Sequence, residues 1–146
     1  MASQPPAPLV GRLHEVGRKI GAREAAHRDA LATAREVADR LRAKVAEAIE
    51  GFHVGAEDAG APHLRIDVGE PCLDHKHARA VQFELCRGRC KALVTVKSRG
   101  DVTMVGPFRQ GKAEGPCRTF PFGAEVEIDA ALGDFLERFL EEASAP

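Results

Sequence analysis

Near residue 62 the spacing of the apolar residues changes from three and four to two, and this change constrains the fold more than any other feature. Before it, apolar residues recur as they do on one face of an α-helix. After it, apolar and polar residues alternate, as they do along strands with one buried face. The sequence therefore predicts an α+β fold in which helices pack on an antiparallel sheet.

Residues 9–50 are rich in Ala, Arg, Glu and Leu and predict one long helix, either continuous or interrupted near residues 17–28. The helix could be interrupted there because Glu24 and His27 break the apolar stripe. Gly51 is the expected stop signal. In the second half of the helix the stripe consists of Leu31, Ala34, Ala38, Leu41 and Val45.

A continuous helix over residues 9–50 would be about 60 Å long at about 1.5 Å per residue, which is longer than one small sheet can cover. The stripe therefore predicts an interface, through which the helix either dimerises with another copy or docks onto a protein partner. The alternative is a bent helix that folds back on its own domain.

Residues 51–62 contain Gly and Pro and predict a linker. Residues 63–146 predict an antiparallel meander of four or five strands, followed by a C-terminal amphipathic helix packed on the sheet in two layers. The last strand is expected at residues 124–128, with Asp129 as the N-cap of the final helix. Residues 1–8 are expected to form a disordered tail that precedes a single domain.

Gly88 and Arg89 separate two alternating segments and predict a two-residue hairpin turn. With this turn all three facing pairs are apolar: Leu85 with Ala92, Phe83 with Val94, and Val81 with Val96. The same register places Cys90 on the apolar face and Cys86 on the opposite face. Despite their attractive spacing, these two thiols are therefore not expected to bind one metal ion.

Cys72, His75 and His77 precede the hairpin and are the candidate metal ligands, because thiolates and imidazoles are the ligands that zinc prefers. Three protein ligands and an open position would form a catalytic type of zinc site. The same Cys72 beside a histidine could instead act as a nucleophile, with Asp74 as the orienting group. The simplest alternative is a packed thiol next to two exposed imidazoles, with no cofactor bound.

From Arg87 to Arg118 the chain has eight bases against two acids. The segment 106–118 is long and contains glycine, proline and flanking bases, which suits a loop that binds a carboxylate or phosphate. The candidate residues for binding a small anion or an acidic partner are Arg109, Lys112 and Arg118. The alternative is a plain connection between strands whose charges are solvated.

The amino-acid composition limits the classes of function that are expected for this chain. The chain has no Trp and no Tyr, so it lacks the residues on which nucleic-acid bases usually stack, and nucleic-acid binding is not expected. No membrane span or secretory signal is apparent, and four cysteines in such a chain suggest free thiols in the cytoplasm. We expect a cytoplasmic, non-enzymatic protein of adaptor or regulatory type that works through protein–protein contact. Metal binding or thiol chemistry, and small-anion binding, are the alternatives.

Overall fold

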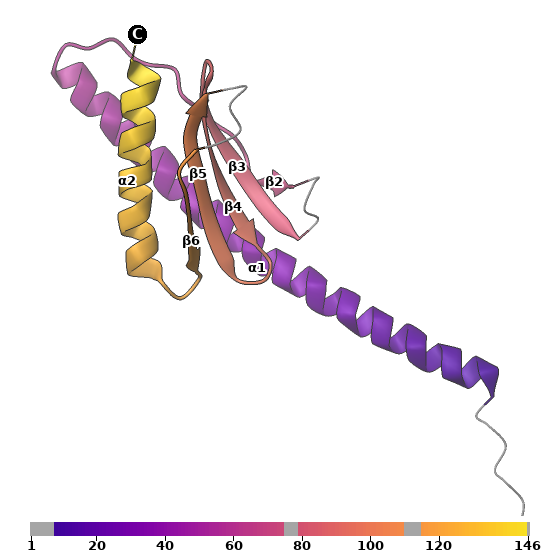
Figure 1. Ribbon diagram of the computed structural model, residues 1–146. Helices are drawn as coiled ribbons and strands as arrows, with labels where there is room; N and C mark the ends of the chain where they lie inside the picture. Colours follow the sequence, from indigo (N-terminus) through magenta and orange to yellow (C-terminus); the bar gives the residue numbers. More distant parts are fainter. Residues whose placement is uncertain (1–7, 75–78, 110–114, 146) are drawn as a thin grey trace, which may run out of the picture.

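The computed structural model describes residues 8–74, 79–109 and 115–145, and it confirms the expected α+β class (Figure 1). Most of the expected tail, residues 1–7, lies outside the described residues. The elements, in chain order, are the helix α1 (Leu9–Asp58), the strands β1 (Asp67–Val68), β2 (Cys72–Leu73), β3 (Ala80–Arg87), β4 (Cys90–Lys97), β5 (Asp101–Arg109) and β6 (Cys117–Pro121), and the helix α2 (Glu125–Ser144).

The six strands form one antiparallel sheet in the order β1-β3-β4-β5-β6, and β2 also pairs with β3. The hairpin between β3 and β4 has the predicted register, with Leu85 opposite Ala92, Phe83 opposite Val94 and Val81 opposite Val96. Apolar pairing of one face therefore suffices to set the register of this hairpin.

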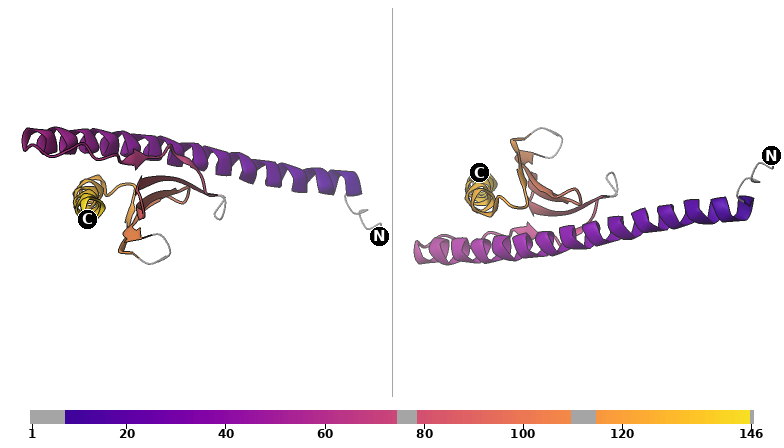
Figure 2. Two further views of the ribbon diagram at one scale, coloured as in Figure 1. Left: turned by 90° about the horizontal axis from the view of Figure 1, so that it is seen from above. Right: turned by 90° about the horizontal axis from the view of Figure 1, so that it is seen from below.

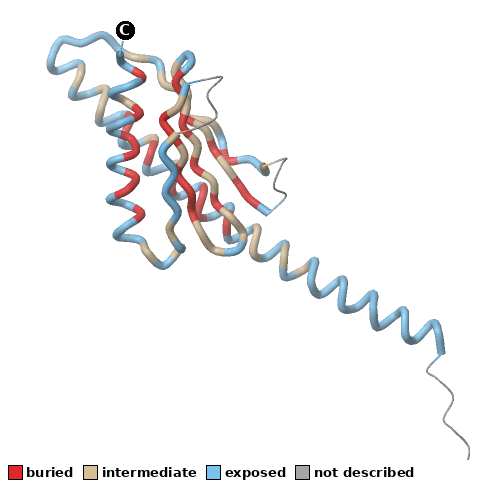
Figure 3. Tube along the Cα trace, in the orientation of Figure 1, coloured by how far each residue is buried: buried red, intermediate tan, exposed pale blue. Residues whose placement is uncertain are grey.

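Both helices pack on the apolar face of the sheet, α1 mainly on β3 and β4 and α2 mainly on β4 and β5. Side chains from both helices and from these three strands form one buried cluster, in which Phe83 and Phe139 are the largest fully buried residues. Figure 3 shows buried residues along α2 and the central strands, whereas the N-terminal part of α1 is exposed. Within the described residues no helix covers the opposite face of the sheet, where Thr103 and Thr119 share a hydrogen bond of 2.9 Å. The fold is therefore a two-layer sandwich.

α1 is continuous through residues 17–28 and does not end at Gly51. It continues to Asp58, so most of the expected linker is helical. The reason is that the chain returns along this part of the helix. His53 Nε2 lies 2.6 Å from the carbonyl oxygen of Leu64, and the His53 ring stacks on His63 at 3.9 Å. The helix ends just before Gly60, whose φ of +83° is a left-handed conformation that favours glycine.

The strand expected at residues 124–128 is absent, because α2 begins at Glu125. The alternating residues before Asp129 are the first helical turn, whose Glu125 and Glu127 stabilise the positive end of the helix dipole. Asp129 is therefore not an N-cap; it forms an ion pair of 2.8 Å with Lys44 of α1. The additional edge strand is β6, whose first two residues belong to the segment 106–118 that was expected to be a loop.

α1 extends far past the sheet at its N-terminal end, as Figures 1 and 2 show from three directions. Its 50 residues correspond to about 75 Å at about 1.5 Å per residue. No helix in the described part of the chain is both long enough and apolar enough to cross a bilayer.

Candidate interaction surface

The N-terminal part of α1, residues 9–24, projects beyond the sheet, and every residue in it is exposed. We call this segment the overhang. Five large apolar side chains of the overhang are exposed, and four of them follow the helical spacing of three and four: Leu9, Leu13, Val16 and Ile20 are 69%, 60%, 50% and 49% exposed. A helix of a folded domain normally buries such a stripe. The overhang is therefore an amphipathic helix whose apolar face has no partner among the described residues.

The apolar face of the overhang continues the face of α1 that packs on the sheet. Val16 and Ala34 are separated by 18 residues, which is five complete helical turns, and so are Ile20 and Ala38. Ala34 and Ala38 are fully buried against the chain's own core. One continuous face of α1 is thus buried in its second half and exposed in its first half.

The overhang is also basic. It contains two acids, Glu15 and Glu24, and four bases, Arg12, Arg18, Lys19 and Arg23. Arg12 and Lys19 each directly precede an apolar residue of the stripe, so both lie on the same flank of it. Glu15 precedes Val16 on that flank and forms an ion pair of 3.3 Å with Arg18. An apolar stripe with a basic flank fits a surface that is apolar along its centre and acidic along one edge.

A groove of about 470 Å³ runs between α2 and the ends of β5 and β6, and we call it the α2 groove. Met104, Ala131 and Phe135 contribute its apolar part. Its charged residues come mainly from one flank of α2, and they are Arg118, Asp134, Glu137, Arg138 and Glu141. The volume lies in the usual range for binding sites, about 300–1,000 Å³.

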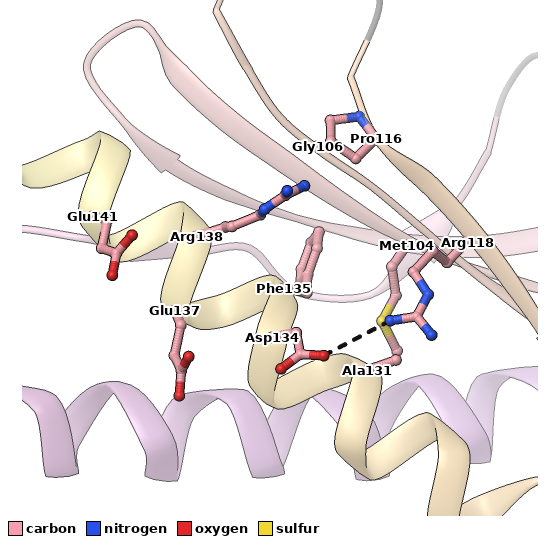
Figure 4. Close-up of a pocket in the computed structure, with 10 residues that line it drawn as sticks. All are labelled: Met104, Gly106, Pro116, Arg118, Ala131, Asp134, Phe135, Glu137, Arg138 and Glu141. Carbon is pink, nitrogen blue, oxygen red and sulfur yellow. Dashed lines mark ion pairs between the residues drawn. The ribbon is translucent and has the colours of Figure 1, made fainter.

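The charged residues of the α2 groove are only partly paired. An Arg118 Nη1 lies 3.9 Å from Oδ2 of Asp134, and the Arg118 guanidinium also lies 5.0 Å from the centre of the Phe120 ring. Figure 4 shows Arg138 extending from α2 towards Gly106 and Pro116. Glu137 and Glu141 point away from these two residues. Neither glutamate has an ion pair with a described residue.

One end of the α2 groove is shaped by close backbone contacts. The amide nitrogen of Gly106 donates a hydrogen bond of 2.8 Å to the carbonyl oxygen of Pro116. Gly106 has a φ of +113°, and a Cβ atom at this position would lie 3.0 Å from the carbonyl oxygen of Lys91. Glycine is therefore required at this position by both backbone conformation and space.

The stripe predicted as an interface is part of the chain's own core. Ala34, Ala38, Leu41 and Val45 are buried, and Leu31 packs partly buried against the same cluster. These five residues are therefore not available to a partner. The exposed part of this apolar face lies nearer to the N-terminus than the predicted residues, because periodicity is the same in both halves of the helix.

The candidate metal site cannot be assembled from the described residues. Cys72 is exposed on β2, and His75 and His77 lie outside the described residues. In residues 8–74, 79–109 and 115–145 no group of three or more Cys, His, Asp or Glu side chains could hold a metal ion.

The four cysteines are free thiols in different surroundings. Cys72 and Cys117 are exposed, and Cys86 is half-buried beside Lys91. Cys90 is buried with the apolar face, as the hairpin register predicted. Burial, and to a lesser degree the carboxylate of Glu142, raises the pKa of Cys90, while Arg109 partly offsets this effect. Cys90 is therefore a packing residue of the core, and its burial disfavours the thiolate.

The three bases of the predicted anion loop do not form one site in the described structure. Arg109 is exposed at the end of β5, opposite Cys90 on β4, and Lys112 lies outside the described residues. Arg118 lies on β6 and lines the α2 groove near Asp134. Comparisons with protein-family models, with curated proteins and with solved structures gave no match.

The sequence reasoning missed the α2 groove. Its acids, Asp134, Glu137 and Glu141, follow the helical spacing of three and four on one flank of α2. That spacing was visible in the sequence. What the sequence could not show is that α2 leaves the neighbouring part of the sheet uncovered.

Proposed function

We propose that this protein works through protein–protein contact and that the overhang is its docking element, with a second copy of the chain as the partner. The protein acts as a non-enzymatic, adaptor-like or regulatory component. Its four free thiols are consistent with a reducing compartment such as the cytoplasm. The observation that carries the proposal is the exposed stripe Leu9, Leu13, Val16 and Ile20, on the helix face that is otherwise buried.

A second copy is the favoured partner because the charges of the chain are segregated. The net charge of −1 conceals a basic overhang and an acidic α2. In the overhang, four bases stand against two acids, whereas α2 has seven acids and one base, Arg138. A chain with two oppositely charged surfaces attracts its own copies in solution.

The expected affinity follows from the apolar area. Burying a whole Val, Leu or Ile side chain contributes roughly 1.5–3 kcal/mol, so burying the exposed half of each would contribute about 1 kcal/mol. Two overhangs with four such side chains each would contribute about 8 kcal/mol against an association cost of about 4–15 kcal/mol. The apolar area therefore supports at most a weak dimer, with a Kd of about 1 mM, and attraction between the oppositely charged surfaces supplies any tighter association.

Sedimentation equilibrium of the untagged full chain tests this proposal over a series of concentrations. The wild type should shift from monomer to dimer as its concentration rises. Val16→Asp should shift the protein back to monomer, because a carboxylate would be buried without a partner. Val54→Asp is the matched control: Val54 lies on the same helix and is exposed to a similar degree, but outside the overhang. A wild type that stays monomeric at millimolar concentration would contradict the proposal.

A further inference from the structure

We infer that the α2 groove of one copy receives the overhang of a second copy. This inference rests on the self-association proposed above and adds the receiving surface. The groove lies over a part of the helix-bearing face of the sheet that α2 does not cover. Arg118 and Phe120 pair with Met104 and Val102, both buried on that face. Arg118 is nevertheless exposed, and Phe120 is only half-buried. A third helix would complete this layer.

The groove and the overhang have similar lengths. The residues of α2 that line the groove extend from Ala131 to Glu141, which corresponds to about 15 Å along the helix axis. The apolar stripe of the overhang extends from Leu9 to Ile20, about 17 Å. The stripe can therefore lie along the groove with its apolar side chains over Met104 and Phe135.

The charges have the same spacing on both surfaces. Asp134 and Glu141 are seven residues apart on α2 and both line the groove, with Glu137 between them. These three acids exceed the two bases of the groove, Arg118 and Arg138, and Asp134 lies 3.9 Å from Arg118. Arg12 and Lys19 are also seven residues apart, on one flank of the apolar stripe. Seven residues are about 10.5 Å along either helix, so two acids and two bases can meet in register.

A direct pairing of two overhangs lacks this electrostatic support. Two apolar stripes in contact would bring the flanks that carry Arg12 and Lys19 of the two copies close together, and like charges repel. The two arrangements therefore respond to salt in opposite directions. Added salt weakens docking of the basic overhang on the acidic groove, whereas it strengthens pairing of two basic helices.

Overhang and groove are different surfaces of one chain, so each of two copies can offer its overhang to the groove of the other. This exchange makes two identical contacts and closes the assembly as a dimer. Each chain then supplies the helix that completes the uncovered layer in its partner.

Charge reversal with full-length variants tests the inference by sedimentation equilibrium. Asp134→Lys with Glu141→Lys should raise the Kd for self-association at least tenfold, and so should Arg12→Glu with Lys19→Glu. A chain that carries all four substitutions should return to within about threefold of the wild-type Kd, because opposite charges face each other again. The wild-type affinity should also fall as salt is added.

The matched control is Glu50→Lys with Glu57→Lys. These two exposed glutamates are also seven residues apart, but they lie at the far end of α1 and should leave the Kd unchanged. Circular dichroism and urea unfolding verify that each variant is folded.

Two results separate the inference from the proposed function. If Val16→Asp abolishes self-association while reversal of Asp134 and Glu141 leaves the Kd unchanged, the overhang is the docking element and the receiving surface is wrong. A dimer that becomes tighter with salt would also overturn the groove as the receiving surface, in favour of paired overhangs. A monomeric wild type would overturn both proposals.

Discussion

Truncation of Ile20 or Ile49 to alanine distinguishes the exposed half of the apolar face of α1 from the buried half. The two isoleucines are 29 residues apart, or about eight turns, so they point in nearly the same direction from the helix. Ile20 is 49% exposed on the overhang, whereas Ile49 is 5% exposed and belongs to the core. The same substitution therefore tests one face in two environments.

Ile49→Ala removes buried methyl and methylene groups and leaves a cavity, so it should lower the free energy of unfolding by about 3 kcal/mol, within the usual range of 2–5 kcal/mol. For a chain of this size that corresponds to about 6–12 °C in Tm. Ile20→Ala leaves no cavity. The higher helix propensity of alanine offsets the small contact that is lost, so the change should stay within about 0.5 kcal/mol.

Urea unfolding, followed by far-UV circular dichroism, measures both values. The protein concentration should be well below the Kd for self-association, so that the overhang of the monomer is tested. Equal losses for Ile20→Ala and Ile49→Ala would refute the reasoning, because the overhang would then pack on its own domain. An Ile49→Ala loss below about 1 kcal/mol would refute the assignment of Ile49 to the core.

Four further predictions concern glycines, thiol reactivity, pH dependence and metal. Gly133→Ala in α2 has open space around its Cβ position and should stabilise the protein by about 1 kcal/mol in thermal unfolding. Gly106→Ala should destabilise it by about 1–3 kcal/mol, because of its φ of +113° and the nearby Lys91 carbonyl. A change in stability of the same sign for the two variants would contradict this prediction. A thiol reagent should modify exposed Cys117 in the folded protein and Cys90 only after unfolding. Because burial raises the pKa of Cys90, stability should be retained below about pH 8.5 and fall above it, and Cys90→Ala should flatten this fall. Metal analysis of untagged protein tests the zinc hypothesis: a stoichiometric metal lost in Cys72→Ala would support it, and a metal-free wild type would refute it.

Local pairing rules predicted the hairpin correctly. The register of β3 and β4 follows from three apolar pairs around Gly88, because a slip of one residue would move every apolar side chain to the other face. The same rule separated Cys86 from Cys90. Both predictions depend only on residues close in sequence, and for this reason the sequence was sufficient.

The helix boundaries were harder to predict. Gly51 is a good stop signal in isolation, yet α1 continues past it to Asp58 because His53 contacts the returning chain at Leu64. Residues 124–128 alternate like a strand, but Ile128 also fits the apolar face of α2 and is buried there. Tertiary contacts outweighed the local signals in both places.

The sequence by itself determined which faces of the elements are apolar: the stripe of α1, the alternating strands and the face of α2. Only the tertiary structure decided what covers each face. The stripe has the same period at Val16 as at Ala34, but the sheet reaches only the second of these positions. Periodicity describes the orientation of side chains around one helix axis, whereas burial depends on where the rest of the chain ends in space. The overhang is exposed because the sheet does not reach it. The candidate interface is therefore the overhang, which precedes the predicted stripe Leu31–Val45.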